Sequence, residues 1–211
     1  MELYNYYRSS ASWRVRIALA LKGLDYDYLP IHLVRKEQTE TGFAQLSGTG
    51  LVPLLVLDGG QRLHQSMAII EYLEETVPEP PLLPRDALGR ARVRALAQDV
   101  ACEIHPLNNT RVLAYLSDTL GVGDAAKSAW IQRWIEGGLE VVERQLAARP
   151  STFCHGETPG LADCLLVPQV FNARRFECRL DHVPNVVRVH AACMAHEAFS
   201  STQPSACPDA E

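Results

Sequence analysis

The chain has 211 residues, of which 47% are hydrophobic and 21% are charged, and its formal net charge is −5. This composition excludes a disordered chain, and the length suits one large domain or two small ones. No apolar run approaches the roughly 18–20 residues that cross a bilayer, and the acidic balance argues against nucleic acid as the main partner. The sequence "MELYNYY" lacks the features of a signal peptide, so we expect a cytoplasmic protein with no membrane partner.

The six cysteines and seven histidines do not have the spacing of metal ligands. The sequence contains neither a CxxC pair nor an HExxH motif. We therefore expect no metal site, and reduced, mostly buried thiols.

The first 80 residues mix strand and helix signals. Strands are predicted for residues 2–7, 26–33, 51–58 and 61–64. Helices are predicted from Ala11 to a stop at Lys22-Gly23 and over residues 65–78, with a loop or helix before the third strand. Pro30 places the second strand at a sheet edge, and "DGG" (58–60) predicts a hairpin turn.

Strand signals almost vanish after a proline-rich segment, "VPEPPLLPRDALG" (77–89). The predicted helices that follow are residues 89–119, 124–148, 160–173 and 184–197. We therefore expect an α/β domain at residues 1–80, a linker at 81–88 and an all-helical domain at 89–211 whose last residues fray.

Three motifs indicate which protein family the predicted domains resemble: "RSSASWRVRIAL" (8–19), "LVPLL" (51–55) and "HQSMAIIEYLEE" (64–75). Together with the order of elements, they make the first domain resemble a thioredoxin fold and the whole chain resemble a cytosolic glutathione transferase. The closest resemblance is to the zeta class, which includes maleylacetoacetate isomerases. Residues 104–113 and 162–176 also resemble the corresponding segments of the zeta class.

The resemblance implies a glutathione-dependent cis–trans isomerase that acts on a small maleyl dicarboxylate, either maleylacetoacetate or maleylpyruvate, in aromatic catabolism. It implies thiolate addition to the double bond, rotation and elimination, and a homodimer. Two alternatives stay open. One is a general glutathione transferase or peroxidase, and the other is a binding module that keeps the fold without catalysis.

The serine cluster after Arg8 is the first candidate site. A redox thioredoxin would place a CxxC at this helix start, whereas this chain has Ser9, Ser10 and Ser12. By resemblance, Ser9 and Ser10 are catalytic, and the Ser9 hydroxyl stabilises the thiolate of glutathione. The alternative is that the serines only cap the helix. Zeta-class enzymes commonly have Cys where this chain has Ala11.

Two further motifs are expected to bind glutathione. Pro53 stands where the thioredoxin fold uses a cis-proline, which turns the backbone of Val52 towards a peptide ligand; the alternative is a trans-proline that opens the strand. Gln65 and Ser66 stand at a helix N-terminus, which favours an anion. By resemblance the anion is the γ-glutamyl carboxylate; the alternative is that Ser66 is a plain N-cap.

The remaining glutathione candidates are weaker. Gln38 follows the second strand and is expected at the glycyl end of glutathione. His105 and Asn109 are expected one turn apart on one face of the predicted long helix, lining a cleft by resemblance, and Arg111 follows them. A packed or solvated His105 is the alternative.

Arg8 and Arg175 are the candidates for holding the substrate carboxylates, because a guanidinium binds a carboxylate with two parallel hydrogen bonds. Exposed arginines in surface ion pairs are the alternative, and the choice among Arg8, Arg111, Arg174 and Arg175 stays open. Family members usually have Ser or Thr where Gly160 precedes "LAD", with Asp163 three residues on.

Overall fold

The computed structural model describes all 211 residues, which form two compact units. Met1–Leu82 and Ala195–Glu211 make the first unit, and Leu83–Met194 makes the second. The sequence assigned residues 195–211 to the helical domain, with a frayed tail at 200–211, but residues 195–211 pack with the first unit. The Trp13 indole N–H donates to Thr202 Oγ1 at 3.1 Å, a contact that no local sequence signal announces. No helix combines the length and apolar character needed to cross a membrane.

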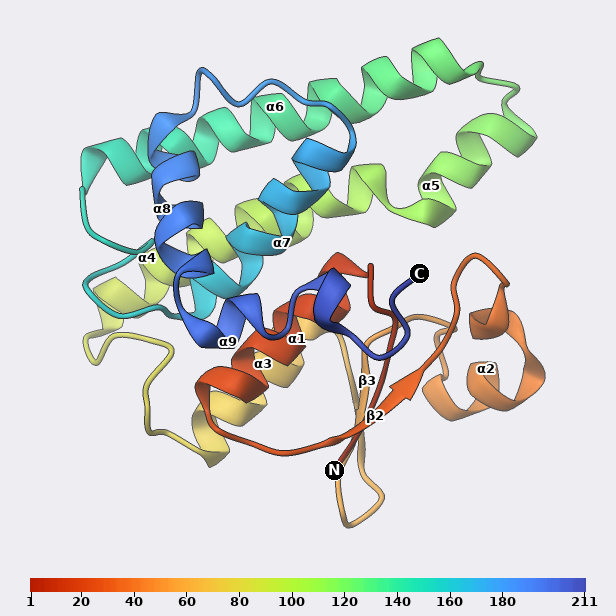
Figure 1. Cartoon of the computed structure of the whole chain (residues 1–211), viewed down its shortest axis with the longest axis horizontal. Helices are drawn as coiled ribbons and strands as arrows, with labels where there is room; N and C mark the ends of the chain where they lie inside the picture. The colour runs from red at the N-terminus through yellow and green to blue at the C-terminus, as the bar shows by residue number, and fades with distance from the viewer. The chain divides into compact units, whose positions relative to one another are not determined.

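The first unit has the thioredoxin order of elements that the sequence predicts. Its elements are β1 (Glu2–Asn5), α1 (Ser10–Leu21), β2 (Asp27–Pro30), α2 (Thr41–Ser47), β3 (Leu54–Val56), β4 (Arg62–His64), α3 (Ser66–Thr76) and, from the tail, α9 (Glu197–Ser200). The sheet order is β2-β1-β3-β4; β1 and β2 are parallel and the other pairs antiparallel. Figure 1 shows α1 and α3 on one side of the sheet and α2 on the other. As expected from Pro30, β2 is an edge strand.

The core of this unit lies between the sheet and the helices α1 and α3. Leu3 and Leu55 from the sheet, Ile17 from α1 and Ile69 from α3 are fully buried. Burial of a side chain of this size contributes about 1.5–3 kcal/mol. The two helices therefore have fixed positions on the sheet, and their N-termini hold two of the expected site motifs.

A buried ion pair lies at the C-terminal end of α1 and joins α1 to α3. Lys22 Nζ lies 2.7 Å from Glu74 Oε2 and also donates to the carbonyls of Val77 and Pro80. The Lys22 side chain is 0% exposed. The expected helix stop at Lys22 is confirmed, but Lys22 also ties the end of α1 to α3 and to the chain that follows α3.

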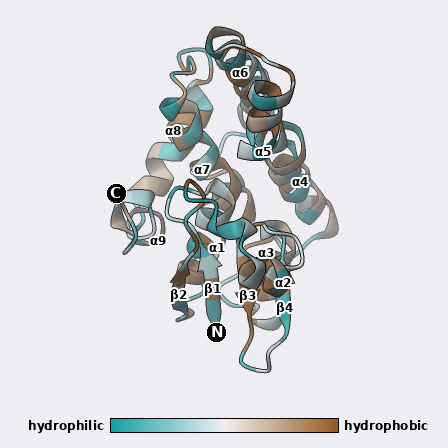
Figure 2. Ribbon diagram, turned by 90° about the vertical axis from the view of Figure 1, so that its right-hand side faces the viewer, coloured by the Kyte–Doolittle hydropathy of each residue, from teal (hydrophilic) through white to brown (hydrophobic).

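The second unit is helical, as expected. Its helices are α4 (Ala87–Gln98), α5 (Thr110–Ala114), α6 (Asp124–Ala148), α7 (Leu161–Arg175) and α8 (Pro184–Met194). Residues 161–170 of α7 are all buried, so α7 is the central helix of the unit. Buried residues recur on α6 every three or four positions, and Figure 2 shows both hydrophobic and hydrophilic residues along it, as expected of an amphipathic helix.

Residues 89–119 are helical, but they do not form one helix, and the break includes Pro106, where the sequence predicts a kink. After α4, the chain forms a π-helical turn (Asp99–Ile104), a 3-10 turn (His105–Asn108), α5 and a second π-helical turn (Tyr115–Thr119). Pro106 cannot donate a helical hydrogen bond, and Asn109 takes an extended backbone (φ −67°, ψ 144°) that starts α5. The helix is therefore interrupted within the segment that contains His105.

The start of α7 follows the sequence expectation. Gly160 is the N-cap, and Asp163 Oδ2 accepts the Gly160 N–H at 2.9 Å. Asp163 Oδ1 also accepts the Cys154 N–H and the Cys193 thiol. Burial raises the pKa of Asp163, and these donors oppose the rise. The aspartate thus makes the half of a capping box in which the N3 side chain accepts the N-cap N–H, and the other half is missing because glycine has no side chain.

Candidate functional site

Ser9 is both the N-cap of α1 and an available donor. Its Oγ accepts the N–H of Ser12 at 3.2 Å, and its carbonyl accepts the N–H of Trp13 at 2.9 Å. Ser9 is half-buried. Because capping uses an oxygen lone pair, the hydroxyl hydrogen can still donate to a ligand. Capping and thiolate stabilisation, posed as alternatives by the sequence, are therefore compatible in one side chain.

The other serines of the cluster differ in exposure. Ser10 begins α1 and is 8% exposed, whereas Ser12 is 0% exposed. Ser12 therefore has no surface on which a ligand could bind, which removes it from the cluster of hydroxyl donors. The role of Ser10 stays a prediction.

The N-terminus of α3 lies beside α1. Ser66, the first residue of α3, is 6% exposed, and its Oγ accepts a hydrogen bond from Arg14 Nη1 at 3.3 Å. Gln65, the N-cap, is exposed and has a positive φ of 69°, an unusual conformation for a residue other than glycine. Such backbone strain is concentrated at functional sites. The helix end therefore combines free N–H groups, a hydroxyl and a nearby buried guanidinium, all of which favour an anion.

The Val52–Pro53 peptide bond is cis, as predicted. Val52 is half-buried and packs against a cluster formed by Tyr6, Tyr7 and Cys207. Since Tyr6 and Tyr7 lead into Ser9, the cis-proline loop and the Ser9 loop share this support. Gln38 lies in a 3-10 turn (Glu37–Thr39), its carbonyl oxygen is close to Gly50 of the segment before Val52, and its side-chain Oε1 is buried without a hydrogen-bond partner.

Arg8 is half-buried next to Ser9. Its guanidinium carbon lies 5.9 Å from the ring centroid of Tyr6 and 5.6 Å from that of Tyr7. A guanidinium at such a distance is attracted to the face of an aromatic ring. The two rings therefore hold Arg8 near the candidate site. This contact differs from the surface ion pair that was the alternative interpretation of Arg8.

Four predicted residues belong to the second unit. Asn109 is the N-cap of α5, and its Oδ1 accepts the N–H of Arg111 at 3.2 Å. Because the helix is broken between them, His105 and Asn109 do not share a helical face, and that prediction is wrong. Arg111 is exposed in the first turn of α5. Arg175 ends α7, is exposed, and lies 5.0 Å from the ring centroid of Phe176.

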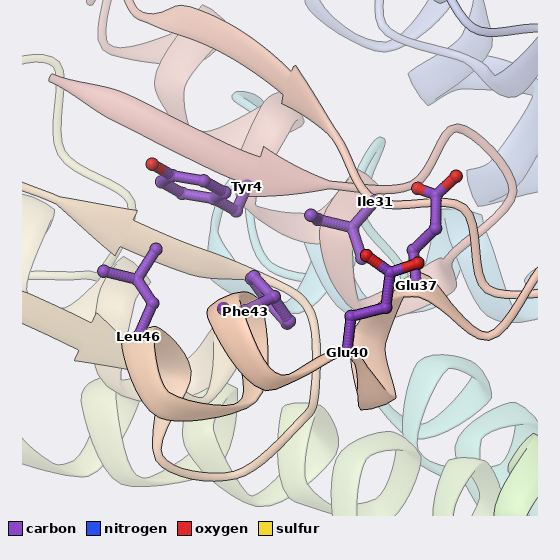
Figure 3. Close-up of a pocket in the computed structure, with 7 residues that line it drawn as sticks. Tyr4, Ile31, Glu37, Glu40, Phe43 and Leu46 are labelled. Carbon is purple, nitrogen blue, oxygen red and sulfur yellow. The ribbon is translucent and has the colours of Figure 1, made fainter.

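A hollow of about 390 Å³ lies elsewhere in the first unit (Figure 3). Tyr4 on β1 and Phe43 and Leu46 on α2 form its apolar part, and Glu37 and Glu40 lie close to one another at its edge. It contains none of the predicted site residues. Two carboxylates disfavour an anion such as glutathione, so the helix N-termini are the better candidate site.

Both arginines of α1 are buried structural residues, whereas sequence reasoning predicts a structural role for only one of them. Arg14 contacts Ser66, and Arg16 is 1% exposed, with hydrogen bonds to the carbonyls of Tyr6 and Tyr7 at 3.3 and 2.9 Å. The available signal was their position in an otherwise apolar helix, since arginines are seldom fully buried unless their donors are used.

Comparison with known proteins finds relatives that match the chain over nearly its whole length. The family model "Glutathione S-transferase, N-terminal domain" matches residues 3–81. A maleylpyruvate isomerase from Ralstonia sp is 50% identical over 99% of this chain and 99% of its own. No metal-binding group of three or more His, Cys, Asp or Glu side chains is present among the 211 residues.

Solved structures agree at the level of the fold and of the sequence. A holo structure of a maleylpyruvate isomerase, a bacterial zeta-class glutathione S-transferase, has a TM-score of 0.97 and 50% identity, with all of both chains covered. A maleylacetoacetate isomerase from Anaeromyxobacter dehalogenans, with glutathione bound in its active site, has a TM-score of 0.91 and 43% identity over 100% of this chain and 97% of that chain.

Proposed function

Because the chain belongs to the zeta-class glutathione transferase family of maleylpyruvate and maleylacetoacetate isomerases, we propose that it is a glutathione-dependent cis–trans isomerase of a maleyl dicarboxylate. The observation that carries this proposal is the 50% identity over 99% of both chains. Identity of this extent covers both units, including the segments that hold the candidate arginines. A general glutathione transferase does not need arginines that bind a dicarboxylate, so we favour the isomerase over this alternative function.

The residues of the first unit fit glutathione. The N-terminus of α3, with Ser66 and the Gln65 backbone, takes the γ-glutamyl carboxylate, because helix N–H groups and the helix dipole favour a negative charge. Val52, before the cis peptide bond, offers its backbone N–H and carbonyl to the peptide. Ser9 lies at the N-terminus of α1 and offers a hydroxyl hydrogen to the sulfur.

When bound, glutathione supplies the nucleophilic thiol that this serine site lacks. An ordinary thiol with a pKa of about 8.5 is only a few per cent ionised at pH 7. The Ser9 hydroxyl and the free N–H groups of α1 favour the charged form. Stabilising it by about 2–3 kcal/mol lowers the thiol pKa by roughly two units, so most of the cofactor becomes reactive at neutral pH.

The arginines act on the substrate. A maleyl dicarboxylate carries two carboxylates and a double bond conjugated to a carbonyl, so negative charge grows on the carbonyl oxygen when a nucleophile adds. Arg8, held beside Ser9 by two aromatic rings, is proposed to bind a carboxylate or this growing charge. Arg175 at the end of α7 is proposed to bind the other carboxylate. Each guanidinium orients the substrate as well as neutralising it.

The homodimer and the cytoplasmic location are part of the same proposal. Both rest on the resemblance to the family. His105, Asn109 and Arg111 are proposed to lie near the glutathione, and Asn109 also starts α5 by accepting the backbone N–H of Arg111.

Assaying both substrates tests the function. Maleylacetoacetate and maleylpyruvate should each be offered with and without glutathione, and the trans product followed by proton magnetic resonance. We expect at least one to isomerise, and only when glutathione is present. Turnover of neither substrate, alongside rapid conjugation of a neutral electrophile, would assign the protein to the general transferases instead.

A further inference from the structure

The C-terminal segment after α9 runs beside the start of α1. Figure 1 shows α9 and the residues that follow it next to α1. Arg16 on α1 donates to the Thr202 carbonyl at 3.1 Å, and Trp13 donates to its hydroxyl. Both contacts lie within the first unit. The end of the chain is therefore anchored on the helix whose N-terminus holds Ser9.

Asp209 binds the backbone that leads into Ser9. Its Oδ2 accepts the N–H of Tyr7 at 3.1 Å, and its Oδ1 accepts the hydroxyl of Tyr28 on β2. Burial raises the pKa of Tyr28, so the phenol stays protonated and donates to the carboxylate. Asp209 thereby joins the edge strand to a residue two positions before Ser9.

Arg16 holds the same turn from the opposite, carbonyl side. Its guanidinium donates to the carbonyls of Tyr6 and Tyr7 as well as to Thr202. The Tyr6 carbonyl also accepts the N–H of Ser9 at 3.0 Å. A single buried guanidinium thus connects the C-terminal segment, the turn and the backbone of Ser9.

Apolar packing adds a third connection. Cys207 forms a buried cluster with Tyr6 and Tyr7, and Val52 packs against it. The C-terminal segment therefore supports both loops that are proposed to contact glutathione: the turn before α1 and the cis-proline loop.

We propose that residues 202–209 position Ser9 for its action on the glutathione thiol, with Asp209 as the positioning residue that fixes the Tyr6–Ser9 turn. This inference rests on the proposed function. The turn lies outside regular structure, so its geometry depends on these contacts. Misplacing a catalytic group by about 1 Å can lower the reaction rate about 100-fold. Contacts that fix the position of Ser9 therefore affect the rate.

The test compares two carboxylates near the C-terminus. Asp209→Ala removes both contacts, whereas Glu211→Ala removes contacts with Arg35 and His32 but no hydrogen bond to the Tyr6–Ser9 turn, and it serves as the matched control. The readouts are the thiol pKa of bound glutathione, from thiolate absorbance against pH, and kcat and KM for isomerisation. We expect Asp209→Ala to raise the thiol pKa by about half a unit to one unit and to lower kcat about three- to tenfold. Glu211→Ala should leave all three unchanged.

A double variant separates positioning from general stabilisation. If Asp209 acts through Ser9, Asp209→Ala adds no further change of thiol pKa to Ser9→Ala. A lower unfolding midpoint with a wild-type thiol pKa would show a structural role only and would overturn the inference. Should Asp209→Ala fail to fold, Tyr28→Phe removes one donor from Asp209 and is judged by the same criteria. An unchanged thiol pKa in Ser9→Ala would instead overturn the role of Ser9, and the inference with it.

Discussion

Replacing Ser66 by alanine should weaken glutathione binding without stopping the chemistry. Ser66 is 6% exposed at the first position of α3, and its oxygen already accepts from Arg14, so its hydrogen is left to donate to the γ-glutamyl carboxylate. A hydrogen bond to a charged group contributes about 1.5–3 kcal/mol. Its loss corresponds to an affinity about 10- to 150-fold lower.

Titration calorimetry measures this affinity, and Ser66→Thr is the matched control because it keeps the hydroxyl. We expect Ser66→Thr to stay near the wild-type affinity and kcat at saturating glutathione to change little in either variant. Unfolding midpoints should be recorded beside the affinities, since Ser66→Ala also removes an acceptor from buried Arg14. An unaltered affinity in Ser66→Ala would mean that Ser66 only begins the helix, and the assignment of the carboxylate site would be wrong.

Three further predictions concern the substrate, the fold and the assembly. Arg8→Met and Arg175→Met should each lower kcat/KM for isomerisation by about 30- to 150-fold, a loss of about 2–3 kcal/mol, while conjugation of a neutral electrophile stays unchanged; equal losses in both assays would refute the clamp. Lys22→Met should lower the free energy of unfolding in urea by about 3–5 kcal/mol, because it removes the charge that faces buried Glu74. A decrease below about 1 kcal/mol, which is typical of an exposed ion pair, would contradict this prediction. Sedimentation should find a homodimer at micromolar concentration, and a monomer would refute the predicted assembly.

The sequence predicted those parts of the fold that have a local signal. Whereas the cis bond before Pro53 was predicted from the resemblance to the thioredoxin fold, the hairpin at Asp58-Gly59-Gly60 and the edge position of Pro30 depend on short, specific residue patterns. Ser9 and Ser66 were found in the same way, because each stands at a helix start. Such patterns report the backbone conformation directly, so they transfer well from sequence to structure.

The sequence failed where distant residues decide the structure. Residues 200–211 read as a polar, proline-containing tail, but Trp13, Arg16 and Tyr28, far away in the chain, are among the residues that hold them in place. Similarly, Lys22 read as an ordinary exposed helix end, although Glu74 draws it into the core. Pro106 predicts a kink next to His105, but the π-helical turns Asp99–Ile104 and Tyr115–Thr119 have no such local signal.

The most direct test of the central claim is whether glutathione is regenerated. The protein should be given a large excess of maleyl substrate over glutathione, and both the trans product and the free thiol measured until the reaction ends. The account predicts complete isomerisation, with many product molecules formed per glutathione and the thiol concentration restored. Consumption of one glutathione per substrate, with a stable thioether as the product, would contradict it and show a transferase.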